Sequence, residues 1–399
     1  MRDEIAREAE QAAAAVGRLT DEGVARALEH AAELVAERHD AIANANADDV
    51  DAANLDEGAL DRLRLDDARI AALGEQLAEL AALPPLERDE DAWRLENGLR
   101  VSVRRIPIGA VGANFEARPN VAVDVAGQLL KSLNGAVLRT GGAALRTVTV
   151  LVDEVLRPAL AGAGLPPEAV GLVRSPEREG ARILVSLPHV LPLVILRGSG
   201  ETTAALAREA ASHGVRTLAH AEGGGVLYIG AAADPAKAEA LVGASLDRLG
   251  VCNRLNLLLV DRDATVNVLP VLERLGIATR EPERLGHEWA NDPEHIASVT
   301  VRTVDSLEEA VALANRETSG LAASIVTEDE AAAETFLESY RGTAAFWNAT
   351  TRFTDGFALT GSPETGINVD RVPGPRGPVT YRDLYLRQYR VVGDGTQHR

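Results

Sequence analysis

Residues 108–142 read IGAVGANFEARPNVAVDVAGQLLKSLNGAVLRTGG, and this stretch decides the fold. Its first residues, Ile108–Ala113, form a short apolar run of the kind that favours a buried strand. The apolar positions of Val121–Leu133 recur with helical spacing, and Ala136–Arg139 is a second apolar run before Gly141-Gly142. This order predicts one unit of a parallel sheet, because the helix carries the chain back to the edge where the next strand starts.

The same alternation continues on the carboxyl-terminal side of this stretch. We expect helices over Leu145–Leu160, over Arg178–Ser186 and from Thr202, and strands over Val170–Val173, Leu191–Leu196 and Arg216–Leu218. Beyond residue 250 the predicted strands are Leu255–Val260, Ala297–Val304, Ala323–Val326 and Ala344–Trp347, with helices over Ser306–Arg316 and Ala331–Tyr340. Such alternation is typical of an α/β protein whose parallel sheets have helices on both faces.

The flanking segments have other patterns. The first ~80 residues are rich in Ala, Glu and Leu at helical spacing and predict several amphipathic helices, which end at Pro84-Pro85. Leu99–Ile106 and Tyr381–Val392 alternate between apolar and polar residues, as exposed strands do. Residues 350–380 are rich in Gly, Pro and Thr, which predicts irregular structure there.

The composition limits the class of protein. A chain of 399 residues exceeds one ordinary hydrophobic core, so we expect more than one domain. The formal charge of −19 argues against general binding to nucleic acid or membrane lipids, but a local arginine cluster could still hold a small anionic substrate. The sequence has no apolar run that would span a bilayer, and its acidic start lacks the core of a signal peptide. We therefore expect a cytoplasmic location.

Cys252 is the only cysteine, so it has no intrachain disulfide partner, and we expect no metal site. It follows a helical pattern that runs from Asp234 to about Leu249 and ends at Gly250, and it precedes the predicted strand at residue 255. A thiol at such a junction can share a cleft with its own backbone N–H, which suits a nucleophile that generates an oxyanion. An inert, buried cysteine is the alternative reading of the residue alone.

Two glycine turns follow predicted strands and open predicted helices, Arg139-Thr-Gly141-Gly142 and Arg197-Gly198-Ser199-Gly200. Backbone N–H groups in such turns suit the phosphates of a dinucleotide. The arginine at each strand end predicts a preference for NADP over NAD, because guanidinium groups bind phosphate well. Neither turn has the full G-x-G-x-x-G spacing, so a turn that simply needs glycine is the alternative for each.

Four segments resemble the γ-glutamyl phosphate reductases (glutamate-5-semialdehyde dehydrogenases), a branch of the aldehyde dehydrogenase superfamily. Residues 105–124, RIPIGAVGANFEARPNVAVD, are similar to that family's PIGVIGVIYEARPNVTVD, and residues 130–142 are similar to LKSGNAVILRGG. Residues 250–253 match GVCN, and residues 348–356, NATTRFTDG, are similar to NASTRFTDG. The order and spacing agree from about residue 100 to the C-terminus.

The resemblance implies an aldehyde dehydrogenase-like α/β fold with a Rossmann-type parallel-sheet cofactor domain, an α/β catalytic domain and a small β oligomerisation arm. On this basis we expect the NADP-binding domain in 1–98 and 107–223, the catalytic domain in 224–360, and the arm and tail in 99–106 and 361–399. The implied activity is NADPH-dependent reduction of L-glutamyl 5-phosphate to L-glutamate 5-semialdehyde and phosphate through a cysteine thioester, in proline biosynthesis. A homodimer or homotetramer is expected, with glutamate 5-kinase as an expected protein partner.

The resemblance also implies roles for individual residues. Cys252 would be the nucleophile, and its own amide and the Asn120 side chain would bind the oxyanion. The expected substrate contacts are Arg118, Glu116, Asn253, Arg352 and His220. The expected cofactor contacts are Arg139, Gly141, Gly142, Arg197, Gly198, Ser199 and Gly200. For Arg118 and Arg352 a structural ion pair is the alternative, with Glu116 and Asp355 near enough in sequence to be partners.

The departures from the family pattern leave other functions open. The family usually continues NALETLLV after the cysteine, where this chain has Asn253-Arg254-Leu-Asn256-Leu. Altered segments of this kind would also fit a reductase of a different acyl phosphate. Glu222 precedes the thiol by thirty residues, and as a base it would instead make the protein a hydrolytic NAD(P)-dependent aldehyde dehydrogenase. A non-catalytic binding relative is disfavoured by the intact thiol segment.

Overall fold

The computed structural model describes the chain except residues 199, 221–222, 372–373 and 398–399. The chain forms two compact units: unit 1 comprises Met1–Leu218, Ser362–Gly366 and Val379–Arg399, and unit 2 comprises Ala219–Gly361 and Ile367–Pro378. Within the described residues, no helix combines the length and the apolar character needed to cross a bilayer. The roles predicted for the domains stay predictions.

The larger sheet has the strand order β15-β14-β7-β6-β3-β4-β5. Its strands are β3 (Ala110–Phe115), β4 (Gly135–Thr140), β5 (Val170–Val173), β6 (Leu193–Arg197), β7 (Arg216–His220), β14 (Gly366–Asn368) and β15 (Gly377–Val379). β3 pairs in parallel with β4 on one side and β6 on the other, and β4 pairs in parallel with β5. The strand order therefore reverses between β3 and β6, which makes the predicted Rossmann-type sheet a confirmed feature.

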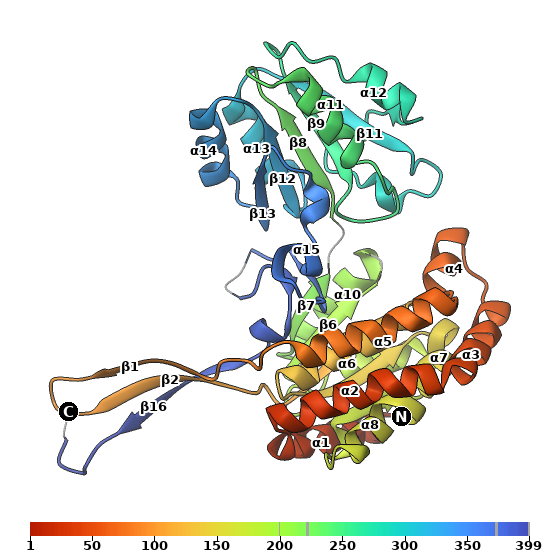
Figure 1. The fold of residues 1–399 in the computed structure, drawn as a ribbon, viewed down its shortest axis with the longest axis vertical. Coiled ribbons are helices and arrows are strands. Elements are labelled where there is room, and N and C mark those ends of the chain that lie inside the picture. The colour runs from red at the N-terminus through yellow and green to blue at the C-terminus, as the bar shows by residue number, and fades with distance from the viewer. Residues whose placement is uncertain (199, 221–222, 372–373, 398–399) are drawn as a thin grey trace. The chain divides into compact units, whose positions relative to one another are not determined.

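Helices cover both faces of this sheet (Figure 1). They are α1 (Arg2–Ala15), α2 (Asp21–Glu37), α3 (His39–Ala52), α4 (Glu57–Leu63), α5 (Asp67–Ala82), α6 (Asn120–Lys131), α7 (Leu145–Val150), α8 (Arg157–Gly162), α9 (Arg178–Leu184) and α10 (Gly200–Ser212). A π-helical segment joins α7 to α8. The core of one face includes α2, α5, α6 and α7, and the core of the other includes α1, α9 and α10. The predicted N-terminal amphipathic helices are thus confirmed.

A separate sheet of order β1-β2-β16 extends away from the helices of unit 1 as a long ribbon (Figure 1). It contains β1 (Asp89–Arg94), β2 (Arg100–Ile106) and β16 (Leu386–Val392), paired antiparallel. The predicted strand Tyr381–Val392 was wrong in its first part, because Tyr381 is fully buried and its hydroxyl donates to the Pro84 carbonyl, at 2.7 Å. Within the predicted arm and tail 361–399, β14 and β15 belong to the larger sheet.

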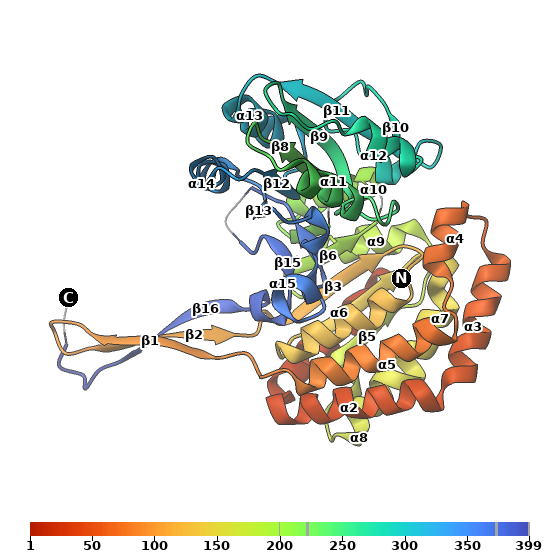
Figure 2. The same ribbon diagram turned by 45° about the horizontal axis from the view of Figure 1, so that its top comes forward.

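Unit 2 contains a sheet of order β10-β11-β9-β8-β12-β13. Its strands are β8 (Gly225–Ile229), β9 (Leu255–Asp261), β10 (Ala278–Thr279), β11 (Ser298–Val304), β12 (Ala322–Val326) and β13 (Ala344–Trp347), and all of these pairs are parallel. Figure 2 shows helices on both sides of it: α11 (Pro235–Ala244) and α12 (Leu269–Arg274) pack on one face, and α13 (Leu307–Glu317) and α14 (Glu330–Ser339) on the other. A short helix, α15, covers Gly356–Thr360.

Candidate active site

Cys252 lies in the turn that leads into β9, at the amino-terminal edge of the sheet of unit 2. Its side chain is partly buried and packs against a small apolar cluster that includes Leu321, Ala322 and Ile367. The preceding helix does not reach Leu249 as predicted but ends at Ala244. The thiol is therefore held by a structured turn with one side against apolar residues, a setting compatible with a nucleophile.

Tertiary hydrogen bonds explain the early end of that helix. The Ser245 hydroxyl pairs with the Thr350 hydroxyl, at 2.8 Å, and the Ser245 carbonyl accepts from the Leu255 amide, also at 2.8 Å. At the same edge, Gly225 at the start of β8 lies close to the Arg254 carbonyl oxygen. A Cβ on residue 225 would come within 2.7 Å of that oxygen. The thiol turn is thus tied to two other segments at the edge of the sheet.

Asn253 holds the Thr-Arg-Phe-Thr motif beside the thiol. Its side chain is buried, and its Nδ2 donates to the carbonyls of Arg352, at 3.1 Å, and Thr354, at 3.0 Å. Its backbone carbonyl accepts from the Thr351 hydroxyl, at 2.9 Å. The structure therefore brings Asn253 and Arg352 together, and the substrate contacts predicted for both residues stay predictions.

Arg352 is engaged by two side chains of unit 2. Its Nε donates to Asp247 Oδ1 at 2.7 Å, and its Nη1 donates to the Asn253 amide oxygen. The carboxylate partner is therefore Asp247, and Asp355 instead caps α15 by accepting from the Ala358 amide. About a fifth of the Arg352 side chain (21 %) stays exposed, so a substrate contact would have to use the remaining edge of the guanidinium.

Arg254 and Asn256, which depart from the family pattern, anchor a neighbouring segment. The fully buried Arg254 side chain donates to the carbonyls of Leu255, at 2.9 Å, Ile296, at 2.6 Å, and Ser298, at 2.5 Å. Burial lowers the pKa of Arg254 to about 10. Asn256 Nδ2 donates to the His287 carbonyl, and its Oδ1 accepts from the Trp289 amide. Sequence reasoning missed this role, although two polar residues beside a buried strand were a signal of an internal anchor.

The second group of predicted residues lies in unit 1, in the turn from β3 to α6. Ala117 has φ of +46°, a left-handed conformation that costs an alanine about 1 kcal/mol and turns the chain sharply before Pro119. Asn120 is the first residue of α6, and Arg118 is half-buried. The Glu116 carboxylate lies beside the second glycine turn, because a Cβ on Gly198 would come within 3.5 Å of it. These residues occupy the carboxyl ends of β3 and β6, where open α/β sheets bind ligands.

Asp124, which sequence reasoning did not single out, accepts a hydrogen bond from Asn120 Nδ2 at 3.1 Å. The two residues are four apart, so they share one face of α6. Burial raises the pKa of Asp124 to about 7, and the nearby Glu364 carboxylate adds to this, while the positive charge of Arg197 opposes it. Asp124 Oδ1 and Arg197 Nε are buried, and within the described part of the chain neither has a hydrogen-bond partner. Arg197 thus lies near the proposed oxyanion donor.

Arg139 is buried and bound to backbone. Its Nη1 donates to the Asn114 side chain at 3.1 Å, and its Nη2 donates to the carbonyls of Pro176, at 3.4 Å, and Glu177, at 2.8 Å. Burial lowers its pKa. A guanidinium held in this way shapes the turn after β5, and little of it is available to a phosphate.

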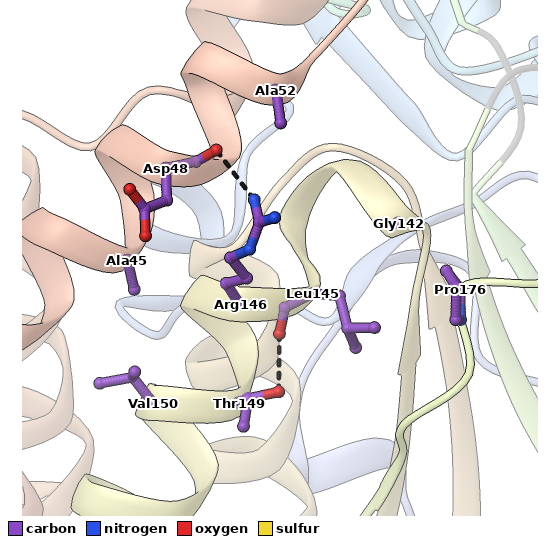
Figure 3. Close-up of a pocket in the computed structure, with 9 residues that line it drawn as sticks. All are labelled: Ala45, Asp48, Ala52, Gly142, Leu145, Arg146, Thr149, Val150 and Pro176. Carbon is purple, nitrogen blue, oxygen red and sulfur yellow. Dashed lines mark hydrogen bonds between the residues drawn. The ribbon is translucent and has the colours of Figure 1, made fainter.

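A pocket of about 540 Å³ lies beside the first glycine turn (Figure 3). It is lined by residues of α3, the turn, α7 and the segment after β5: Ala45, Asp48, Ala52, Gly142, Leu145, Arg146, Thr149, Val150 and Pro176. Gly141 precedes this lining, and Gly200 opens α10 after the second turn. Ser199 and Glu222 lie outside the described residues, as does the side chain of His220.

Comparison with known proteins agrees with this architecture. Residues 2–294 and 297–377 match the model of the aldehyde dehydrogenase family. The γ-glutamyl phosphate reductase of Clavibacter michiganensis is 38 % identical over 390 residues, which is 92 % of this chain and 89 % of that protein. That of Persephonella marina is 32 % identical over 420 residues, 98 % of this chain and 93 % of that protein.

Solved structures give the same assignment of fold. The crystal structure of γ-glutamyl phosphate reductase from Thermotoga maritima has a TM-score of 0.91 and 28 % identity, and covers 99 % of this chain and 100 % of that one. An acetylating aldehyde dehydrogenase from Geobacillus thermoglucosidasius, at 17 % identity, has a TM-score of 0.72 and covers 100 % of this chain and 98 % of that one. This more distant likeness concerns the fold alone.

Proposed function

The chain belongs to the aldehyde dehydrogenase family and, within it, to the γ-glutamyl phosphate reductases, and from this premise we propose that it reduces L-glutamyl 5-phosphate to L-glutamate 5-semialdehyde with NADPH. The observation that carries the proposal is the likeness to γ-glutamyl phosphate reductases over almost the whole chain, at 32 % and 38 % identity. The accessible side of the Cys252 turn supplies the nucleophile that such a reaction needs.

The proposed reaction has two steps at Cys252. The thiolate attacks the acyl carbonyl, the carbon–sulfur bond forms, and inorganic phosphate leaves with the electrons of the carbon–oxygen bond. An acyl phosphate is already activated, so this step needs no strong general acid. When bound, NADPH would supply the hydride that reduces the thioester carbonyl; the carbon–sulfur bond then breaks, which releases the aldehyde and returns Cys252 to the thiolate.

The remaining roles follow from charge and hydrogen bonding. We propose the Cys252 amide and the Asn120 Nδ2 as donors to the tetrahedral oxyanion. The Asp124 side chain orients that amide, because Asn120 Nδ2 donates a hydrogen bond to it at 3.1 Å. Arg118 and the exposed edge of Arg352 are proposed to bind the two anionic ends of the substrate.

The described residues of unit 1 fit a dinucleotide. The pocket beside Gly142 has a volume within the range of small-molecule sites, and its walls are mainly apolar. The glycine turn lines this pocket at Gly142, which carries no side chain (Figure 3). We propose that this pocket and the turn after β6 hold the cofactor.

The remaining proposals concern the location, the pathway and the assembly of the protein. We propose a cytoplasmic enzyme of proline biosynthesis, supplied with its substrate by glutamate 5-kinase. The arm formed by β1, β2 and β16 carries exposed apolar residues, including Leu386, Tyr389 and Val391, each about half exposed (49 %, 56 % and 53 %). Exposed apolar strands favour association, so we propose that the arm joins subunits of a homodimer or homotetramer.

The reverse reaction tests the proposed function. Purified protein is given glutamate-5-semialdehyde and NADP⁺, with and without inorganic phosphate, and NADPH absorbance is followed. The proposal expects sustained turnover only with phosphate, because phosphate is the acceptor of the acyl group. Steady turnover without phosphate would instead favour a hydrolytic aldehyde dehydrogenase, and selective turnover of another aldehyde would favour a different acyl phosphate.

A further inference from the structure

The pocket beside the first glycine turn is lined mainly by apolar side chains, and its charged lining residues are one cation and the acidic Asp48. Ala45 and Ala52 come from α3, Leu145 and Val150 come from α7, and Pro176 follows β5 (Figure 3). Apolar walls suit an aromatic base, which gains by leaving water. The cation is Arg146, whose side chain is 58 % exposed and therefore within reach of a ligand in the pocket.

The structure holds Arg146 in place while leaving part of its guanidinium available. Nη1 donates to the Asp48 carbonyl at 2.9 Å and lies 3.8 Å from the Asp49 carboxylate. That carboxylate is buried, and its Oδ2 accepts from the backbone amide and the hydroxyl of Thr147, both at 2.8 Å, while its Oδ1 accepts from the Arg146 amide at 3.4 Å. Across the described residues, Nε and Nη2 of Arg146 have no partner. Two adjacent N–H donors on a fixed guanidinium form a bidentate site for a phosphate.

The two arginines predicted to select NADP are less suited to this task. Arg139 is buried and bound to backbone carbonyls, and Arg197 acts on the Asp124 carboxylate. We therefore propose that Arg146 binds the 2′-phosphate of NADP, with the adenosine in the pocket of about 540 Å³ beside Gly142. This inference rests on the proposed NADPH dependence and names the residue that selects the cofactor.

Nucleotide fragments test the site without any chemistry on the acyl substrate. Adenosine 2′,5′-bisphosphate and 5′-AMP differ only in the 2′-phosphate, and isothermal titration measures the affinity of each. We expect the wild-type protein to bind the bisphosphate at least about tenfold more tightly, the ratio given by one good charge-assisted contact. Arg146→Ala should reduce that ratio to about one and Arg146→Lys should keep part of it, whereas the affinity for 5′-AMP should change little.

Matched variants show whether the effect belongs to this pocket. Arg26→Ala removes an exposed arginine of α2 that pairs with Glu22, and it should leave the tenfold ratio intact. Ala45→Phe fills the pocket and should weaken both nucleotides, with the melting temperature as a check on folding. Unchanged binding in Ala45→Phe, or an unchanged ratio in Arg146→Ala, would overturn the proposal.

A third nucleotide distinguishes NADP from coenzyme A as the source of a phosphate on the ribose. Coenzyme A carries a 3′-phosphate, so adenosine 3′,5′-bisphosphate is titrated in parallel. The proposal expects the 2′,5′ isomer to bind more tightly, and a preference for the 3′,5′ isomer would show that the pocket does not read NADP. Because none of these titrations involves turnover, they stand apart from the phosphate-dependence test of the proposed function.

Discussion

Replacing Arg254 by leucine tests how unit 2 supports the thiol turn. Arg254 is fully buried, and its guanidinium binds the carbonyls of Leu255, Ile296 and Ser298. Ile296 lies just before β11 and Ser298 is its first residue, so one side chain ties the start of β11 to the start of β9. Leucine keeps an apolar stem in the site and removes every donor.

Two opposing contributions set the change in the free energy of unfolding. Burial lowers the pKa of Arg254 from its usual value to about 10, so removing the buried cation relieves about 3 kcal/mol. Against this, three buried carbonyls lose their donor, at roughly 2 kcal/mol each, or about 6 kcal/mol together. The loss of hydrogen bonds therefore outweighs the relief, and Arg254→Leu should destabilise the protein by about 2–3 kcal/mol.

Tryptophan fluorescence reports both the stability and the local effect. Trp289 is buried in the anchored segment, and its indole N–H donates to the Thr300 hydroxyl at 3.0 Å. In a background with Trp93→Phe and Trp347→Phe, urea unfolding followed at Trp289 gives the free energy of unfolding. Before the transition, the Arg254→Leu variant should already emit at longer wavelength, because the segment loosens and water reaches the indole.

Arg262→Leu is the matched control. Arg262 follows β9, is 68 % exposed and pairs with Asp305 on the surface, so its loss should change the free energy of unfolding by less than about 0.5 kcal/mol. Equal or greater stability of Arg254→Leu relative to wild type would refute the reasoning. It would show that relief of the buried charge exceeds the loss of the three hydrogen bonds.

Three further outcomes are expected. Cys252→Ser should lower turnover at least about a hundredfold and leave the affinity for adenosine 2′,5′-bisphosphate unchanged, since the thiolate acts only in the chemical step; activity within tenfold of wild type would rule out Cys252 as the nucleophile. Burial raises the folded-state pKa of Asp124 to about 7, above its usual 3.8, so its contribution to stability is full below pH 3.8 and is lost as the pH rises through 7. Asp124→Asn should therefore be more stable than wild type at pH 8, by about 2 kcal/mol after allowance for partial exposure, with the difference vanishing near pH 4 in urea titrations; a difference that is the same at both pH values would contradict this. Val391→Asp, on the exposed arm, should lower the molar mass measured by light scattering, and an unchanged mass would exclude the arm as a subunit contact.

The local features of this fold were predictable because they depend on neighbours in the sequence. The helix predicted over Val121–Leu133 is observed at Asn120–Lys131, and the strand predicted over Ala344–Trp347 has those bounds. Apolar periodicity and glycine turns encode such elements directly. The position of Cys252 just before a strand was likewise predicted, although the helix before it ends earlier than its pattern indicates.

Which partner each arginine takes was decided only by the tertiary structure. Arg352 binds Asp247, far away along the chain, although Asp355 is much nearer in sequence. Arg139 follows a strand as predicted, but packing buries it against the carbonyl of Glu177 and leaves Arg146 exposed at the pocket.

The physical reason is that helices and strands depend on residues close together in the sequence, whereas the partners of a buried polar side chain depend on residues far apart in it. The amino-acid sequence by itself determined the α/β class, most of the helices and strands, the position of the single cysteine before a strand and the family, because repeating apolar positions and short motifs are local. The burial of a polar side chain and the identity of its acceptor depend on which distant segments the packed sheets bring together. Only the tertiary structure could therefore separate arginines that anchor the backbone, such as Arg254, from one placed to meet a ligand, such as Arg146.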